Sequence, residues 1–297
     1  MNESFSIFSH HGSKSGVERA AEVIFTASGF FAVLAVASIT LYMIISGVPA
    51  LFQVGILDIL FGNVWAPTAA DPSYGILYVI LTSIVGTFLA ILIGVPIGLL
   101  TAVFMARYCP AALYRVLKPM LSLMAGIPSI VYGFFGMVLI VPTVRSVFGG
   151  NGNSILSASI LLGLMILPTI TGISESAIRA VPRAYYEGAV ALGATHERAI
   201  FFVELPAARS GLLAAVVLGI GRAIGETMAV IMVAGNQARM PKGILKGVRT
   251  LTANIVMEMG YAADLHREAL IATGVVLFVF ILLINLSCSA LRRRNEA

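Results

Sequence analysis

Six long apolar runs constrain this chain more than any other feature of its sequence. A helix needs about 20 mainly apolar residues to cross a hydrocarbon core of ~30 Å. The runs are 23–46, 74–106, 119–144, 154–174, 210–235 and 269–291. Backbone groups inside a bilayer must hydrogen-bond within the protein, and helices achieve this for a single segment. We therefore expect an all-α membrane protein with about six transmembrane helices.

Composition leaves little room for a soluble domain. Hydrophobic residues make up 59% of the chain and charged residues only 11%, against about 25% charged in ordinary soluble domains. Between the apolar runs, no polar stretch is long enough to fold as a separate catalytic domain. We predict an N-terminal tail at 1–22, a first helix with an external segment at 23–73, a core at 74–291 and a basic tail at 292–297.

The distribution of basic residues predicts the orientation. Six crossings place both termini on one side, and Lys and Arg concentrate on the cytoplasmic side of membrane proteins. One face carries Lys14, Arg19, Arg107, Arg115, Lys118, Arg179, Arg183, Arg198, Arg209, Arg292, Arg293 and Arg294. The other carries Arg145, Arg239, Lys242, Lys246, Arg249 and Arg267. Both termini and the loop 175–209 should therefore be cytoplasmic, in a multi-pass protein of the cytoplasmic membrane surrounded by lipid.

The loop between the fourth and fifth runs predicts a helix–turn–helix unit. Pro182 favours the start of a helix, Gly193 favours a break, and Thr195 can cap a second short helix. Leu205 and Pro206 should end that helix before the fifth run. From these signals alone, the unit is either a rigid knob outside the bilayer or a solvated connector.

The same loop contains a more specific pattern. Its members are Glu187, Gly188, Ala189, Gly193, Val203, Leu205 and Pro206. This spacing resembles the cytoplasmic loop of ABC importer permeases, in which a Glu-Ala-Ala stretch precedes a Gly and a final hydrophobic-x-Leu-Pro. Gly188 replaces the usual first Ala, one small residue for another. The resemblance implies that the loop docks in a cleft of a separate ATP-binding subunit and transmits its movement.

Two further stretches narrow the resemblance. Residues 125–133 read Ala-Gly-Ile-Pro-Ser-Ile-Val-Tyr-Gly, and residues 221–229 read Gly-Arg-Ala-Ile-Gly-Glu-Thr-Met-Ala. They resemble signatures of phosphate-specific ABC importer permeases. Together with Gly86, Thr87 and the segment 249–254, they make the chain similar to the PstC type over roughly residues 74–291.

The resemblance to these permeases also implies a set of partners and a fold. A homologous second permease subunit would complete the pathway, two ATP-binding subunits would drive it, and an extracytoplasmic phosphate-binding protein would deliver the substrate. The fold would be the core of a type I ABC importer permease, in which the first helix can be peripheral to five others.

Five residues are candidates for the substrate pathway: Arg222, Glu226, Thr227, Pro128 and Ser129. Pro128 lacks a backbone donor and leaves a carbonyl free, which indicates either a kink or a neighbouring cavity. Charges inside a bilayer cost ~2.5–3.5 kcal/mol each, and on a helix Arg222 and Glu226 would be four residues apart on one face and able to pair. They either form a structural ion pair or belong to the pathway.

The chemistry of the two charged residues suits phosphate. A guanidinium offers planar donors to two oxygens of the anion and keeps its charge when buried. Glu226 can accept a hydrogen bond from the proton that phosphate still carries near neutral pH, whereas sulfate has no such proton.

Several functions are disfavoured by what the sequence lacks. It contains no Gly-x-x-x-x-Gly-Lys-Ser/Thr phosphate loop, so ATP should be hydrolysed on partner subunits and no cofactor should bind this chain. We expect no catalytic residues and no nucleic-acid binding. We also expect no metal site, since the adjacent His10 and His11 are at best a weak chelating pair.

Other kinds of transport remain open at this stage. Arg222 alone would also suit an importer of sulfate, molybdate or a phosphonate. A secondary transporter driven by an ion gradient is less compatible with the 187–206 pattern, and a membrane scaffold would have no reason to bury Arg222 and Glu226.

The predicted orientation can be tested by thiol labelling. A cysteine introduced at Gly243 should react with an impermeant maleimide in intact cells, and one at Thr195 should react only after permeabilisation. The reverse pattern would overturn both the orientation and the proposed docking of the loop.

Overall fold

The computed structural model describes residues 16–296, with backbone only for Val17 and residues 288–296. His10, His11, Lys14 and Ala297 lie outside the described residues, as do the side chains of the three arginines at 292–294. The first half of the fold contains α1 (Gly16–Val54), α2 (Ile56–Phe61), β1 (Trp65–Ala66), β2 (Ser73–Tyr74), α3 (Leu77–Val103), α4 (Ala111–Gly126), α5 (Ser129–Phe135) and α6 (Val141–Phe148). The second half contains α7 (Ile155–Arg179), α8 (Arg183–Ala191), α9 (His196–Ala199), α10 (Leu205–Ala207), α11 (Arg209–Gly225), α12 (Met228–Val233), α13 (Leu251–Glu258) and α14 (Asp264–Glu296).

The architecture is all-α apart from one short hairpin, as predicted. Three π-helical segments, η1 (Phe104–Tyr108), η2 (Gly136–Ile140) and η3 (Ile200–Glu204), interrupt the α-helices. Within the described residues, five helices are long and apolar enough to cross a membrane, or six when the bent α9–α11 unit is counted as one span. The prediction of about six spans is confirmed.

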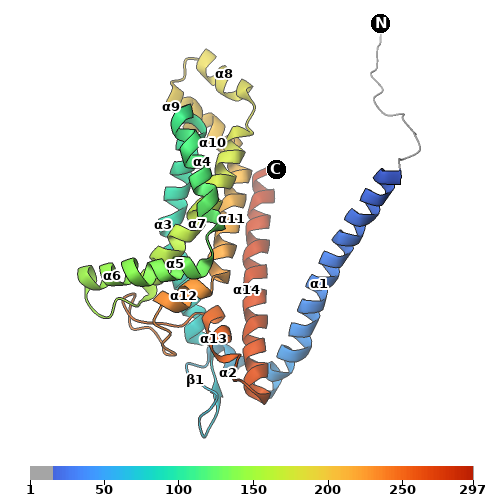
Figure 1. Cartoon of the computed structure of the whole chain (residues 1–297), viewed down its shortest axis with the longest axis vertical. Coiled ribbons are helices and arrows are strands. Elements are labelled where there is room, and N and C mark those ends of the chain that lie inside the picture. The colour runs from blue at the N-terminus through green and yellow to red at the C-terminus, as the bar shows by residue number, and fades with distance from the viewer. Residues whose placement is uncertain (1–15, 297) are drawn as a thin grey trace.

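The long helices α3, α7, α11 and α14 run along a common direction (Figure 1). Helices α8 and α9 lie at one end of this bundle, which we call the loop end. The hairpin β1–β2 and the helices α2 and α13 lie at the opposite end, the hairpin end. Helix α7 is the central element, and its Leu161, Ile166 and Ile170 are fully buried. Polar positions in the bundle are therefore held by a closely packed apolar frame.

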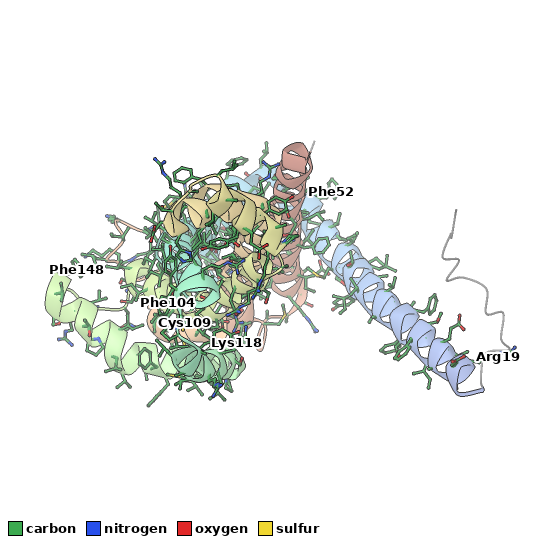
Figure 2. The ribbon with its side chains drawn as sticks, turned by 90° about the horizontal axis from the view of Figure 1, so that it is seen from above. Arg19, Phe52, Phe104, Cys109, Lys118 and Phe148 are labelled. Carbon is green, nitrogen blue, oxygen red and sulfur yellow. The ribbon has the colours of Figure 1, made fainter. Side chains whose placement is uncertain are left out.

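Helix α1 lies apart from the rest of the chain. It approaches α14 near the hairpin end and diverges toward the loop end, with Arg19 far from the bundle in the second view (Figures 1 and 2). At the contact, a Cβ on Gly47 would lie 3.1 Å from the Cα of Ala272, so a glycine allows this approach. Elsewhere α1 presents apolar side chains such as Phe25, which is 75% exposed. That surface requires lipid or a partner.

Two of the predicted spans are not continuous helices. The run 119–144 is divided between α4 and the α5–α6 segment, which runs crosswise to the bundle and carries Phe148 at its tip (Figures 1 and 2). The run 210–235 is divided between α11 and α12. Both divisions fall inside the two stretches that the sequence singled out at 125–133 and 221–229.

Two buried carboxylates fasten the loop end. Glu204, 1% exposed, accepts a hydrogen bond from Arg107 Nε at 2.7 Å, and the same guanidinium donates to the carbonyl of Ile178 at 2.9 Å. Arg107 therefore joins the end of the α3 segment to α7 and to the segment before α11.

Glu175 on α7, also 1% exposed, joins a second set of elements. It pairs with Lys118 of α4 and with Arg179, and accepts a hydrogen bond from Tyr114 at 2.7 Å. The hydrogen bond to Glu175 and burial raise the pKa of the Tyr114 phenol, so it remains a donor at neutral pH. Since α4 has no buried residue of its own, Glu175 is its main polar attachment to the bundle.

For the thiol-labelling test of the orientation, the external loop also offers a position without backbone strain. Gly243 has a φ of 130°, which a cysteine adopts with difficulty. Lys242 is exposed in the same loop and is the better position for an introduced thiol.

Replacing Glu204 should destabilise the fold. Glu204→Gln leaves the half-buried Arg107 guanidinium without a counter-charge, at a cost of about 1–3 kcal/mol. We expect a lower thermal midpoint for the detergent-purified protein. Glu197→Gln, at an exposed position in α9, is the matched control and should not shift it. Equal midpoints for the two variants would show that the Arg107–Glu204 pair contributes no stability.

Candidate functional site

The centre of the candidate site is the break between α11 and α12. Helix α11 ends at Gly225, and Glu226 has extended dihedral angles, with φ −70° and ψ 127°. Its carboxylate turns forward and accepts a hydrogen bond from the amide of Ala229 at 3.3 Å, which stabilises the start of α12. Its carbonyl accepts a hydrogen bond from the hydroxyl of Thr252 at 3.2 Å. Thr227 lies in the two-residue break; its hydroxyl donates to the carbonyl of Gly225 at 3.2 Å and does not cap α12.

Of the two alternatives for Arg222 and Glu226, the structure does not contain the ion pair. Because the helix ends between them, the two side chains do not share a helical face, and they are not among the ion pairs of the described residues. Arg222, which is half-buried, donates from Nη1 to the hydroxyl of Thr169 at 3.2 Å. The guanidinium thus has a neutral partner and retains donors for an anion.

The second break, at Pro128, is confirmed and its free carbonyl is accounted for. Ile127 and Pro128 are extended, with ψ values of 129° and 140°. Pro128 has no amide to donate to the carbonyl of Met124, which accepts instead from the phenol of Tyr132 at 2.9 Å and from the amide of Ile127 at 3.4 Å. The break therefore needs no water-filled cavity beside it. Ser129 begins α5 directly after the break.

The two breaks face each other through the helices that follow them. Helix α5 packs against α12, and a Cβ on Gly133 would lie 3.0 Å from the Cα of Ala229. The glycine therefore allows a close approach of the two short helices. In this way the structure brings the 125–133 and 221–229 stretches together, as one unit across the middle of the bundle (Figure 1).

A small cavity of about 20 Å³ opens at the α11–α12 break. Its polar lining consists of Thr82, Ser83, Thr87, Thr250 and Glu226. A space of this size holds about one water molecule. Its described lining does not include Arg222, Thr227, Pro128 or Ser129. Of the predicted pathway residues, only Glu226 therefore reaches this cavity in the present conformation.

The knob at the loop end has the local structure that the sequence predicted. Pro182 precedes α8, Gly193 has a φ of 89°, and the hydroxyl of Thr195 caps α9 by accepting from the amide of Arg198 at 3.4 Å. The two helices are joined by a hydrogen bond of 2.9 Å between Tyr186 Oη and His196 Nδ1. The chain turns by 69° between α10 and α11, at Ala208, two residues beyond the predicted stop at Pro206.

The surface of the knob is apolar and open. Leu192 is 92% exposed and Phe202 76% exposed. Glu187 and Gly188 are exposed, and Glu187 lines a cavity of about 300 Å³ beside Arg107 and Glu204. Ala189 and Leu205 are half-buried. Two large apolar side chains of the knob are therefore uncovered in this structure.

Several polar residues at these sites were not predicted. Glu175, Glu204 and Arg107 were interpreted as loop or flanking charges, and Thr82 and Ser83 as ordinary members of an apolar run. For Glu175, Glu204 and Arg107, the only signal in the sequence was a charged residue close to the end of an apolar run. For the two hydroxyl residues, only the packing of the 249–254 segment against α3 reveals their role.

No group of three or more His, Cys, Asp or Glu side chains within the described part of the chain is arranged to hold a metal ion. The residues at the break offer an arginine, a carboxylate and hydroxyl groups for binding.

Comparison with known proteins places this arrangement in a family. Residues 94–296 match the family described as the binding-protein-dependent transport system inner membrane component. The chain belongs to this family. Its members are transport components, and the fold described above is that of an ABC importer permease subunit.

Relatives of this permease cover most of its length. A probable ABC transporter permease protein, YqgH of Bacillus subtilis, is 39% identical over 272 residues, covering 89% of the chain and 88% of the relative. The phosphate transport system permease protein PstC of Xylella fastidiosa is 33% identical over 278 residues, covering 87% and 85%. PstC 2 of Mycobacterium tuberculosis is 30% identical over 301 residues, covering 92% and 91%.

Solved structures share the fold of the permease. A bacterial alginate ABC transporter in complex with an alginate-bound periplasmic protein aligns with a TM-score of 0.64 at 16% identity, covering 93% of each chain. The MetNI methionine ABC transporter aligns with a TM-score of 0.55 at 23% identity, covering 74% of this chain and 94% of that one. At these identities the likeness concerns the fold alone.

The turn at Gly193 provides a test of the knob. Gly193→Leu places a side chain at a φ of 89°, which costs about 1–2 kcal/mol and should distort the turn although the space around it is open. If the knob docks on an ATP-binding partner, this variant should insert into the membrane but lose transport coupled to ATP hydrolysis. Gly188→Ala, in a helix and also with open space around it, is the matched control and should be tolerated. Normal transport by Gly193→Leu would exclude a coupling role for the turn.

Proposed function

We propose that this permease is one transmembrane subunit of an ATP-driven importer of inorganic phosphate and forms half of its translocation pathway. The observation that carries the proposal is Arg222, a half-buried arginine without a carboxylate partner at a helix break. The proposal is supported by relatives that are named phosphate transport system permeases over more than four-fifths of the chain.

Arg222 provides the positive charge of the pathway. Its side chain donates to the neutral hydroxyl of Thr169, so the guanidinium carries a charge that an arriving anion can neutralise. Two of its nitrogens can bind two phosphate oxygens at once, a geometry that lysine does not reproduce.

Glu226 provides discrimination among oxyanions. Because it is not paired with Arg222, its charge is not cancelled in the empty site, and an anion without a proton is repelled. Phosphate at neutral pH retains a proton and can donate it to the carboxylate. The hydroxyl of Thr87, which lines the same cavity, can donate to one of the remaining oxygens.

The partners follow from the knob and from the family. A homologous second permease subunit completes the pathway beside the exposed α5–α6 segment, and two ATP-binding subunits receive the knobs built on Gly193 and Leu192. An extracytoplasmic phosphate-binding protein delivers the substrate at the hairpin end. In this assembly both termini are cytoplasmic, ATP is hydrolysed on the partners, and this chain binds no cofactor.

Import of another oxyanion is the second candidate. Sulfate, molybdate and phosphonates would also use Arg222, but sulfate and molybdate lack the proton that Glu226 can accept. Stimulation of ATP hydrolysis by each anion, with its binding protein, in vesicles that contain the complete complex distinguishes these substrates.

Substitution of the two charged residues tests the pathway. Arg222→Met combined with Glu226→Met removes both charges while retaining apolar volume, so the complex should assemble. Loss of a buried, hydrogen-bonded charge contact costs about 2–5 kcal/mol, and we expect phosphate uptake to fall at least ~30-fold. Arg222→Lys keeps the charge but loses the planar donors and should also be severely impaired.

A matched control removes the same kinds of charge elsewhere. Arg267→Met combined with Glu268→Met changes the first turns of α14, where Arg267 is exposed, and should leave uptake near the wild-type rate. Normal phosphate uptake by an assembled Arg222→Met, Glu226→Met complex would refute the pathway role of the break.

A further inference from the structure

A second group of polar side chains is buried at the hairpin end, away from Arg222. We call it the outer polar cluster. It consists of the hydrogen-bonded residues Trp65, Arg249, Asn254, Glu258 and His266, together with Tyr78, which packs in the same hydrophobic core as Trp65 and Leu251. These residues come from β1, α3, the segment before α13, α13 itself and the first turns of α14, which meet near the base of α14 (Figure 1).

The carboxylate in this cluster is contacted by three donor groups. Glu258 Oε2 accepts from Trp65 Nε1 at 2.7 Å and lies 2.9 Å from His266 Nε2. Its other oxygen, Oε1, accepts from Arg249 Nη1. If Arg249 turned toward another anion, Glu258 would keep two partners, so the guanidinium is the group in the cluster that is free to be recruited.

The donors in the cluster, by contrast, are not fully used. Arg249 Nε, Asn254 Nδ2 and the Tyr78 hydroxyl are buried without a hydrogen-bond partner, and they are half of the six such side-chain atoms among the described residues. Tyr78 and Asn254 are 0% exposed. The amide of Asn254 is oriented by its Oδ1, which accepts from Arg249 Nη1 at 3.0 Å, so Nδ2 is the atom left over.

Unused buried donors indicate what the missing partner must be. Each costs about 1–3 kcal/mol while it remains unpaired. A guanidinium, an amide and a phenol together require an acceptor with several oxygens, and the positive charge of Arg249 favours a negative one. A small oxyanion meets both requirements, whereas a water molecule meets only the first.

The cluster is joined to the helix break by a short piece of chain. Thr250, next to Arg249, lines the cavity that Glu226 also lines. The amide of Leu251 donates to Ser83 Oγ at 3.0 Å, and Thr252 donates to the carbonyl of Glu226 at 3.2 Å. An anion bound by Arg249 and Asn254 would therefore lie at the hairpin side of the candidate pathway.

We propose that Arg249, Asn254 and Tyr78 form a second oxyanion site, closed in this conformation, which holds inorganic phosphate before it reaches Arg222. The substrate of the site rests on the proposed function, whereas the site itself rests on the unpaired donors. Its opening requires Arg249 to exchange Glu258 Oε1 for the anion while Trp65 and His266 keep the carboxylate satisfied.

Tyr78→Phe is the decisive variant because it removes one oxygen atom and no known hydrogen bond. If the hydroxyl is only an unsatisfied group, its loss should be neutral or stabilising. If it donates to phosphate, uptake at limiting phosphate should fall about tenfold, and binding of radiolabelled inorganic phosphate to the complex without its binding protein should weaken by a similar factor. Tyr74→Phe is the control. It removes a phenolic oxygen from the hydrophobic core that also contains Tyr78, and it should change neither phosphate uptake nor phosphate binding.

Asn254→Asp provides a second, independent test of the oxyanion site. It keeps the shape and the acceptor for Arg249 but replaces the unused donor by a negative charge, so phosphate binding should fall about 100-fold. Co-purification with the ATP-binding subunits verifies assembly of each variant. Wild-type binding and uptake by both Tyr78→Phe and Asn254→Asp would overturn the second site.

The two proposals can fail separately. If the wild-type complex imports phosphate and the variants behave like it, only the second site is refuted. If the wild-type complex instead transports and binds another oxyanion, and the variants weaken binding of that anion, the phosphate assignment is refuted and the second site stands.

Discussion

Two side-chain hydroxyls make the interrupted helices of this permease possible. A helix break inside a bilayer leaves main-chain groups without partners, and hydrocarbon offers none. The phenol of Tyr132 binds the carbonyl of Met124 released by Pro128, and the hydroxyl of Thr252 binds the carbonyl of Glu226. Because both contacts are provided by the protein itself, the chain can change direction twice near the middle of the bundle and bring α5 against α12. The arrangement of the candidate site depends on these two bonds.

The buried carboxylates at the two ends of the bundle have partners of opposite charge, whereas the arginine at its centre has none among the described residues. At the loop end, Glu175 and Glu204 are each matched by cations, and the resulting contacts hold α3, α4 and α7 together. At the hairpin end, Glu258 is matched by Arg249 and hydrogen-bonded by Trp65 and His266. Arg222, in the centre, has a neutral partner. The matched charges at the loop end maintain the structure, whereas the unmatched charge of Arg222 is available to a substrate.

The sequence was sufficient to predict local structure where the chemistry of a single residue determines its backbone conformation. The N-terminal position of Pro182, the positive φ of Gly193 and the cap formed by Thr195 follow from the chemistry of single residues, and the break at Pro128 does as well. The break at Glu226 was not predicted, because no proline marks it and its stabilising partner, Thr252, lies 26 residues further along the chain. The expected pair of Arg222 and Glu226 assumed a continuous helix and failed with that assumption. The partners of Glu175, Glu204 and Glu258 are likewise remote in sequence, so their burial could not be inferred from the pattern of apolar runs.

The open apolar knob also has a consequence for the life of the subunit in the cell. Leu192 and Phe202 face outward at the end of a rigid pair of helices, so a newly inserted copy would present them until another protein covers them. Exposed apolar surfaces are sites of protein contact, and chaperones and proteases continuously triage incompletely folded proteins. Unassembled copies should therefore be removed from the membrane while assembled ones persist. The exposure of these two side chains would thus tie the number of permease subunits to the number of partner proteins available to cover them.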